Sequence, residues 1–257
     1  MKKICCLLTF ALIAVGYGHN CLAAARIDSG LIASKKLPAA TISFSGYTWN
    51  VKAPAEPQGP GPNVWSAANV YVDNEGSLHL KLAKNATTGK WECAEVSTSE
   101  KFGEGTYQWQ VEGPLATLDK NIVLGLFNYS GRDGSDEMDM EFAQWGDSNN
   151  PHLNYTIWPV DKGTNKAYYT ANFTMPGGTY TTQRFIRKAK SVTFKSLYGF
   201  VDNDNNVFDS KTFKSPASSI STEPMPVYIN LWLYNGQAPT DGKGMEIVIH
   251  SFKFIPL

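Results

Sequence analysis

The feature that most constrains the fold is a series of short strand-like segments separated by Gly, Pro, Asn and Asp, with no apolar repeat at helical spacing. The expected strands are 41–49, 68–72, 77–82, 91–97, 105–111, 121–127, 136–142, 152–158, 180–187, 191–200, 226–233 and 245–254, with a less regular region at 162–178. Segments at this spacing are typical of two packed antiparallel sheets. The sequence therefore predicts an all-β sandwich.

One segment is excluded from the sheets by its composition. Residues 53–62 contain four prolines, which donate no backbone hydrogen bond and so do not pair within a sheet. This segment is expected to be a loop, and in an enzyme it is suited to form one wall of a cleft.

The N-terminus has the pattern of a secretory signal peptide. Two lysines are followed by an apolar run from Ile4 to about Val15 and by small residues at 21–25, which resemble a cleavage site. We therefore expect a signal peptide at residues 1–25, a single domain at 26–257, and a secreted or periplasmic location. Cleavage would leave Cys93 as the only cysteine, and a buried, unreactive thiol is expected there.

Composition indicates the kind of partner. The chain has 23 basic and 23 acidic residues, a formal net charge of zero, and no run of either sign. Nucleic acid and anionic membrane surfaces are therefore not expected as partners. Aromatic residues make up 12% of the chain and charged residues 18%, which fits a neutral sugar ligand, although large β cores also contain many aromatic residues.

An acidic stretch at Asp136–Phe142 alternates carboxylates with apolar residues. In a strand, Glu137, Asp139 and Glu141 share one face, although like charges side by side repel. On a concave sheet, two inward-leaning glutamates separated by about 13 Å of backbone can approach the roughly 5–5.5 Å carboxyl spacing of retaining glycoside hydrolysis. The pattern alone also fits a solvated acidic strand or a calcium site.

The motif Asp136-Glu137-Met138-Asp139-Met140-Glu141-Phe142 resembles the E-x-D-x-E signature of glycoside hydrolase family 16. Further stretches are similar to bacterial lichenases of that family and occur in the expected order: 63–70, 91–95, 100–107, 127–131 and 230–232. The resemblance implies a concanavalin-like β-jelly roll of two antiparallel sheets with a concave substrate cleft. It also implies a secreted, endo-acting, retaining hydrolase of β-glucan, with β-1,3-1,4-glucan as the best match.

The resemblance also supplies roles that the residues alone do not decide. Glu137 matches the family's nucleophile, Glu141 its acid/base, and Asp139 the residue that tunes both. The positions that match sugar contacts are Glu95, Tyr129, Asn154, Trp158, Asn230 and Trp232. We expect a polysaccharide substrate, no cofactor, no metal and a monomer.

Several positions depart from the lichenase pattern. Ser135 replaces a Trp, Ser97 replaces an Arg, and Asn63 replaces the cysteine that pairs with the counterpart of Cys93. His250 replaces an Asp that binds calcium in lichenases. The unbroken acid spacing, without the extra residue that forms a bulge, nevertheless predicts a regular strand and a preference for mixed-linkage glucan.

Two alternatives stay open at this stage. The same fold can hold sugars without cutting them, as a lectin-like binding sandwich does. A retaining enzyme can also pass its covalent intermediate to a sugar, as xyloglucan-type transglycosylases do.

Overall fold

The regular elements are mainly antiparallel strands in this computed structural model, which describes residues 40–160, 166–214 and 220–257. The described residues belong to a compact unit that spans residues 38–257. The expected signal peptide at residues 1–25 lies outside the described residues. No helix in the described part of the chain is long and apolar enough to cross a membrane.

The strands are β1 (Thr41–Phe44), β2 (Tyr47–Val51), β3 (Val64–Trp65), β4 (Val70–Val72), β5 (Leu78–Lys84), β6 (Trp91–Thr98), β7 (Gly105–Glu112), β8 (Ile122–Tyr129), β9 (Glu137–Phe142), β10 (Leu153–Trp158), β11 (Ala167–Ala171), β12 (Tyr180–Lys188), β13 (Ser191–Tyr198), β14 (Val207–Phe213), β15 (Val227–Leu233) and β16 (Met245–Pro256). Short 3₁₀ helices lie at Ala67–Asn69, Leu115–Thr117 and Tyr234–Gly236.

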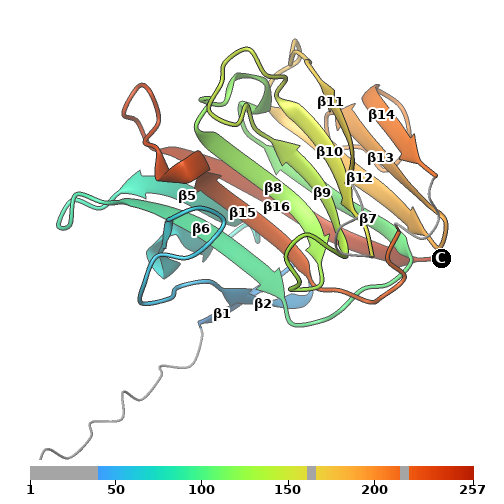
Figure 1. Ribbon diagram of the computed structural model, residues 1–257, viewed down its shortest axis with the longest axis horizontal. Coiled ribbons are helices and arrows are strands. Elements are labelled where there is room, and N and C mark those ends of the chain that lie inside the picture. Colours follow the sequence, from blue (N-terminus) through green and yellow to red (C-terminus); the bar gives the residue numbers. More distant parts are fainter. Residues whose placement is uncertain (1–39, 161–165, 215–219) are drawn as a thin grey trace, which may run out of the picture. The chain divides into compact units, whose positions relative to one another are not determined.

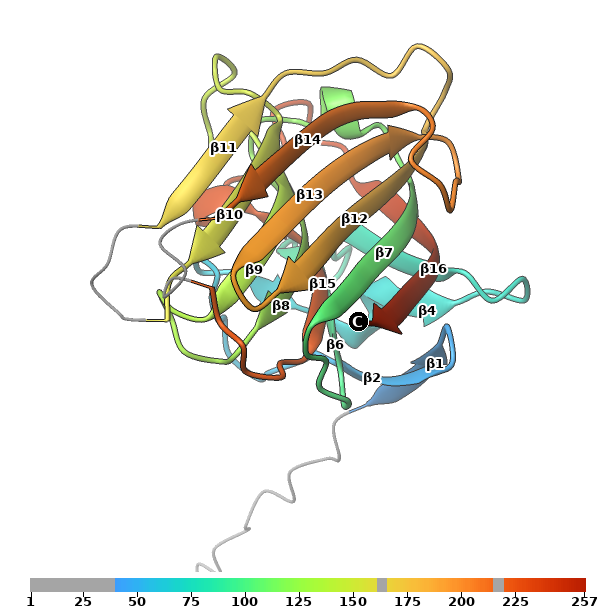
Figure 2. The same ribbon diagram turned by 90° about the vertical axis from the view of Figure 1, so that its right-hand side faces the viewer.

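The strands form two layers. The first layer, here named the cleft sheet, has the order β11-β10-β9-β8-β15-β6, with the β2–β1 hairpin beyond β6. The second, the outer sheet, has the order β4-β5-β16-β7-β12-β13-β14. Strands β5 and β6 pair only through Ala83 with Glu92 and Lys84 with Trp91, and this short pairing connects the two layers. Figures 1 and 2 show the layers from two sides.

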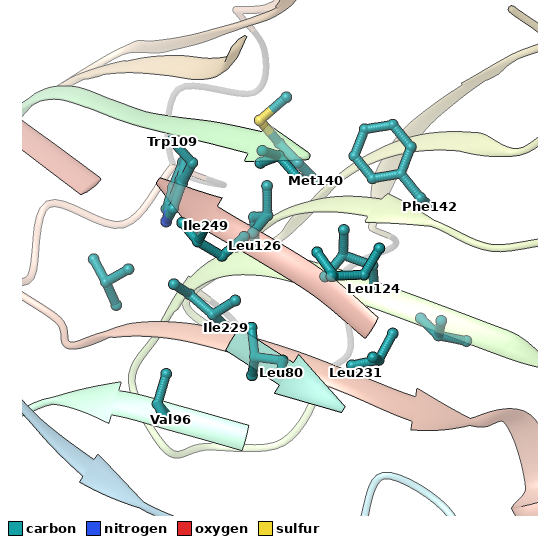
Figure 3. Packing of buried hydrophobic residues seen from close by; sticks show 14 of the residues in the cluster. Leu80, Val96, Trp109, Leu124, Leu126, Met140, Phe142, Ile229, Leu231 and Ile249 are labelled. Atoms are coloured by element: carbon teal, nitrogen blue, oxygen red, sulfur yellow. The ribbon is translucent and has the colours of Figure 1, made fainter. Parts of the chain in front are cut away.

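The core lies between the two sheets (Figure 3). The cleft sheet contributes Met140, Phe142 and Leu126, and the outer sheet contributes Trp109 and Ile249. Each of these side chains is fully buried, and each such burial stabilises the fold by about 1.5–3 kcal/mol. The apolar half of the alternating acidic stretch is therefore part of the core.

The predicted all-β sandwich is confirmed, with local differences at 41–49 and in the unpredicted strands β3, β11 and β14. The stretch 41–49 is a hairpin and not one strand, because Ser45 and Gly46 adopt positive φ angles of 50° and 81°. The region expected to be irregular contains β11, and β14 was not predicted. Both lie at edges of the two sheets, where their exposed outer residues weaken the apolar alternation that marks a strand.

Cys93 is buried and free, as expected. Burial raises the pKa of its thiol to about 12, which makes it a poor nucleophile. The thiol donates a hydrogen bond to Asn63 Oδ1 at 3.4 Å. Asn63 thus lies beside Cys93, where the family resemblance had placed a disulfide partner.

Candidate active site

Strand β9 lies between β8 and β10 in the cleft sheet, three strand positions from β6 (Figure 1). Met138, Met140 and Phe142 are fully buried in the core, and Glu137, Asp139 and Glu141 face a cleft on the other side of the sheet. The alternation of faces is therefore as predicted. The pairing of β9 with both neighbours continues without a register shift from Glu137 to Phe142, so the strand has no bulge.

The cleft has a volume of about 1290 Å³. All of the site residues predicted from the sequence line it: Glu95, Tyr129, Glu137, Asp139, Glu141, Asn154, Trp158, Asn230 and Trp232. Gln58, Gly59 and Pro60 also line it, so the proline-rich loop forms part of its wall as expected.

Other cleft residues were not predicted, among them Lys52, Phe127, Asp133, Trp145, Lys166, Tyr168, Tyr228 and Tyr234. For Phe127 and Tyr228, the strand pairing explains why their side chains face the cleft. Phe127 is opposite both Asp139 and Tyr228 in the register, so it shares their face. The sequence alone does not give this register across β15, which is distant in the chain.

Burial is the largest cause of a raised pKa at all three acids. It raises the pKa of Glu137 to about 8, with a further contribution from the charge of Glu141. The pKa of Asp139 is raised well above its ordinary value by burial and then by Glu137. The pKa of Glu141 is also raised well above its ordinary value, by burial and then by the charge of Asp139.

A hydrogen bond between the carboxyl groups of Glu137 and Asp139 has opposite effects on the pKa values of these two acids. It lowers the pKa of Glu137 and raises that of Asp139, the directions expected when Asp139 carries the proton and Glu137 accepts it. Asp139 Oδ2 accepts a hydrogen bond from Trp158 Nε1 at 2.9 Å. Asp139 Oδ1 is buried and has no hydrogen-bond partner among the described residues.

Glu95 lies on the β6 flank of the cleft and is held by two neighbours. Its Oε1 is 3.0 Å from Lys52 Nζ, and its Oε2 accepts a hydrogen bond from Asn230 Nδ2 at 3.1 Å. Lys52 Nζ also donates to the carbonyl of Gly59 at 2.7 Å, which connects Glu95 to the wall loop. Lys52 therefore supplies a cation at Glu95, although Ser97 replaces the arginine of the lichenase pattern.

Aromatic side chains flank the acids. Phe127 and Tyr228 stack with ring centroids 5.1 Å apart, and Tyr129 donates from its hydroxyl to Asp133 at 2.7 Å. Asn154 accepts from Trp145 Nε1 at 3.1 Å and donates to the carbonyl of Ala143 at 2.9 Å. Asn154 thus lines the cleft but also orients Trp145, a role that the sequence did not suggest.

The described residues contain no group of three or more His, Cys, Asp and Glu side chains arranged to hold a metal ion. His250, at the position that matches a calcium ligand in lichenases, lies 2.7 Å from Glu112 Oε2. His79 lies between Asp73 and Glu246 and stacks on Tyr71. Both histidines are on the outer sheet, away from the cleft.

No family model matches the chain. A β-glucanase from Paenibacillus macerans is 35% identical over 103 residues, which are 38% of this chain and 41% of that protein. The nuclear pore complex protein Nup205 of Drosophila melanogaster is 34% identical over 92 residues, which are 35% of this chain and 4% of that protein. The chain thus spans less than half the length of these curated relatives.

Solved structures match over most of both chains. A Bacillus licheniformis β-glucanase has a TM-score of 0.61 and 19% identity, covering 81% of this chain and 92% of that one. A glycoside hydrolase family 16 endo-glucanase from Bacteroides ovatus has a TM-score of 0.59 and 17% identity, covering 80% and 94%. Rv0315 of Mycobacterium tuberculosis, named a pseudo β-1,3-glucanase, has a TM-score of 0.62 and 15% identity, covering 81% and 91%. The predicted jelly-roll fold and the resemblance to family 16 are confirmed.

Proposed function

We propose that the chain, which has the jelly-roll fold of glycoside hydrolase family 16, is an exported, endo-acting β-glucanase that works with retention. The observation that carries this proposal is the arrangement on β9. Glu137 and Glu141 face one cleft from alternate positions of a regular strand, and Asp139 lies between them with a proton to share.

The family resemblance assigns roles to the two glutamates, and the directions of the pKa shifts support that assignment. The hydrogen bond from Asp139 favours the charged form of Glu137, the form that attacks an anomeric carbon. Burial, the largest cause of the raised pKa of Glu141, keeps this residue protonated, so it is the acid that protonates the leaving glycosidic oxygen. Water then displaces Glu137 from the covalent glycosyl-enzyme, and Glu141 takes up the proton of that water.

The substrate proposal rests on the regular strand. Within the family resemblance, an unbroken E-x-D-x-E strand goes with lichenase-like enzymes, and β9 has continuous pairing on both sides. We propose mixed-linkage β-1,3-1,4-glucan as the preferred polysaccharide. The aromatic and amide side chains of the cleft are of the types that bind neutral sugars.

A reducing-sugar assay on mixed-linkage glucan, laminarin, xyloglucan and agarose tests both levels of the proposal. We expect mixed-linkage glucan to be cut fastest and Glu137→Gln to lose at least about a thousandfold in activity, as removal of a nucleophile does. Faster cleavage of laminarin would refute the linkage preference. If none of the four polysaccharides gains new reducing ends, the proposal that the protein is a hydrolase is refuted.

A sugar-binding protein without catalysis is the second candidate, because one of the similar structures is named a pseudo β-1,3-glucanase. Binding measured by affinity electrophoresis distinguishes the two. A binding protein holds glucan without turnover in both the wild type and Glu137→Gln, whereas an enzyme loses hydrolysis and keeps binding in that variant.

A further inference from the structure

The cleft continues beyond the acid strand onto β11, a strand that the sequence did not predict. Tyr168 of β11 pairs with Thr156 of β10, and Thr156 pairs with Asp139 of β9. Thr170 pairs with Asn154, which pairs with Glu141. Tyr168 and Thr170 therefore lie two strands, or about 10 Å, from the acid strand.

The core does not account for the presence of tyrosine at position 168. Ala167, Tyr169 and Ala171 pack against the buried cluster, and the alternate residues Tyr168 and Thr170 line the cleft. The side chain of Tyr168 is 67% exposed, against 9% for Phe127 and 7% for Trp232 in the same cleft. Its ring is therefore open to the cleft.

Other aromatic side chains of the cleft have partners within the protein. Trp158 donates to Asp139, Tyr129 donates to Asp133, and Phe127 stacks on Tyr228. Within the part of the chain that the structure describes, Tyr168 makes no ring-to-ring contact and no side-chain hydrogen bond. An exposed aromatic face in a polar cleft suits a ligand with an apolar ring face and hydroxyl groups at its edge.

We propose that Tyr168 and Thr170 form a sugar-binding subsite on β11. It would take a neutral hexose unit of the glucan, with the sugar ring on the face of Tyr168 and a hydroxyl group beside Thr170. This inference rests on the proposed function, and it adds a binding position on the flank opposite to Glu95 and Asn230.

The distance between the two flanks determines the length of glucan that the cleft can hold. Glu95 lies on β6, three strands from β9 in the other direction, so the cleft spans five strand intervals, about 24 Å, from β6 to β11. A glucan that occupies both ends crosses the acid strand with several sugar units on each side of the cleaved bond. A subsite on β11 therefore fits the endo-acting cleavage proposed above.

The subsite can be tested by calorimetry, which measures the binding of mixed-linkage glucan oligosaccharides. All proteins in this test carry Glu137→Gln, so that the oligosaccharides are not hydrolysed during the measurement. Adding Tyr168→Ala is expected to weaken binding about three- to tenfold, the loss expected for one aromatic stacking contact. Adding Tyr168→Phe, which keeps the ring, is expected to leave the affinity within about twofold of the parent. Tyr180→Ala is the matched control, because Tyr180 is 48% exposed but lies on β12 of the outer sheet.

Equal affinity of the Tyr168→Ala protein and its parent would overturn the subsite and leave the proposed function intact. An equal loss in Tyr168→Ala and Tyr180→Ala would also overturn it, because the effect would not belong to the cleft. If the parent Glu137→Gln protein binds none of the oligosaccharides, the proposed function itself fails, and the subsite fails with it.

Discussion

Asp139 affects its two neighbouring glutamates in opposite directions. When Asp139 is protonated, its hydrogen bond lowers the pKa of Glu137, and when it is ionised, its charge raises the pKa of Glu141. Because burial raises the pKa of Glu137 to about 8, the low-pH limb of kcat/KM is expected well above the ordinary 4.5 of a glutamate. A protonated Asp139 therefore widens the pH range in which Glu137 is charged while Glu141 is protonated.

Replacing Asp139 tests this separation. In Asp139→Ala the hydrogen bond to Glu137 is lost and the pKa of Glu137 should rise, so the low-pH limb of kcat/KM moves to higher pH and the maximum drops about 10- to 100-fold. Asp139→Asn keeps an N–H for Glu137 and an oxygen for Trp158, so it should move the low-pH limb less than Asp139→Ala does. Identical profiles for the two variants would contradict the shared proton.

The loop between β8 and β9 determines how the acid strand begins. Asp136, just before Glu137, is buried and has a φ of 53°, a left-handed conformation that Asp tolerates better than most residues. Arg132 Nη2 donates to Asp136 Oδ2 at 2.8 Å and to Glu223 Oε2 at 2.5 Å. Arg132 thus ties this loop to the segment before β15 and positions Glu137.

Arg132→Ala is expected to leave the buried carboxylate of Asp136 without its cation. Because Arg132 itself is half exposed, we expect a loss of only about 1–2 kcal/mol in the free energy of unfolding, together with a fall in kcat. Arg132→Lys should recover part of both losses. Urea unfolding and kcat measured on each variant check this, with the exposed Lys243→Ala as control. Unchanged kcat in Arg132→Ala would exclude the positioning role.

At the scale of the whole molecule, the acids make the free energy of unfolding depend on pH. The folded pKa of Glu137 is about 8 and its ordinary value is 4.5, so between these values the folded state binds more protons than the unfolded state. Its contribution to stability is therefore greatest below pH 4.5 and is lost as the pH rises toward 8. Under the proposed function, the burial that causes this loss of stability also raises the pKa values of the catalytic acids.

Glu137→Gln removes the ionisable group and should be more stable than the wild type at neutral pH. We expect a gain of at most about 3 kcal/mol at pH 7, shrinking towards zero near pH 4, where the wild-type glutamate is protonated in both states. Urea unfolding at both pH values measures the gain. Glu75→Gln, on an exposed turn, is the control, and a gain in Glu137→Gln that does not change with pH would contradict the argument.

Much of the fold follows from alternation along single strands. The period of two in Asp136–Phe142 is enough to send Met140 to the core and Glu141 to the opposite face, because successive side chains of any strand point in opposite directions. The family resemblance then placed all nine predicted site residues in one cleft. The edge strands β11 and β14 were not predicted, because apolar and polar residues alternate only weakly along them.

By itself, then, the sequence determined the two faces of the acid strand, the sandwich and the turn-rich loops, since these depend on neighbours in the chain. Only the tertiary structure decided which cation meets Glu95 and that Tyr168 lies in the cleft. Each of these depends on burial or on strand pairing between distant segments. Lys52 and Glu95, or Tyr168 and Asp139, are brought near one another only when the sheet assembles.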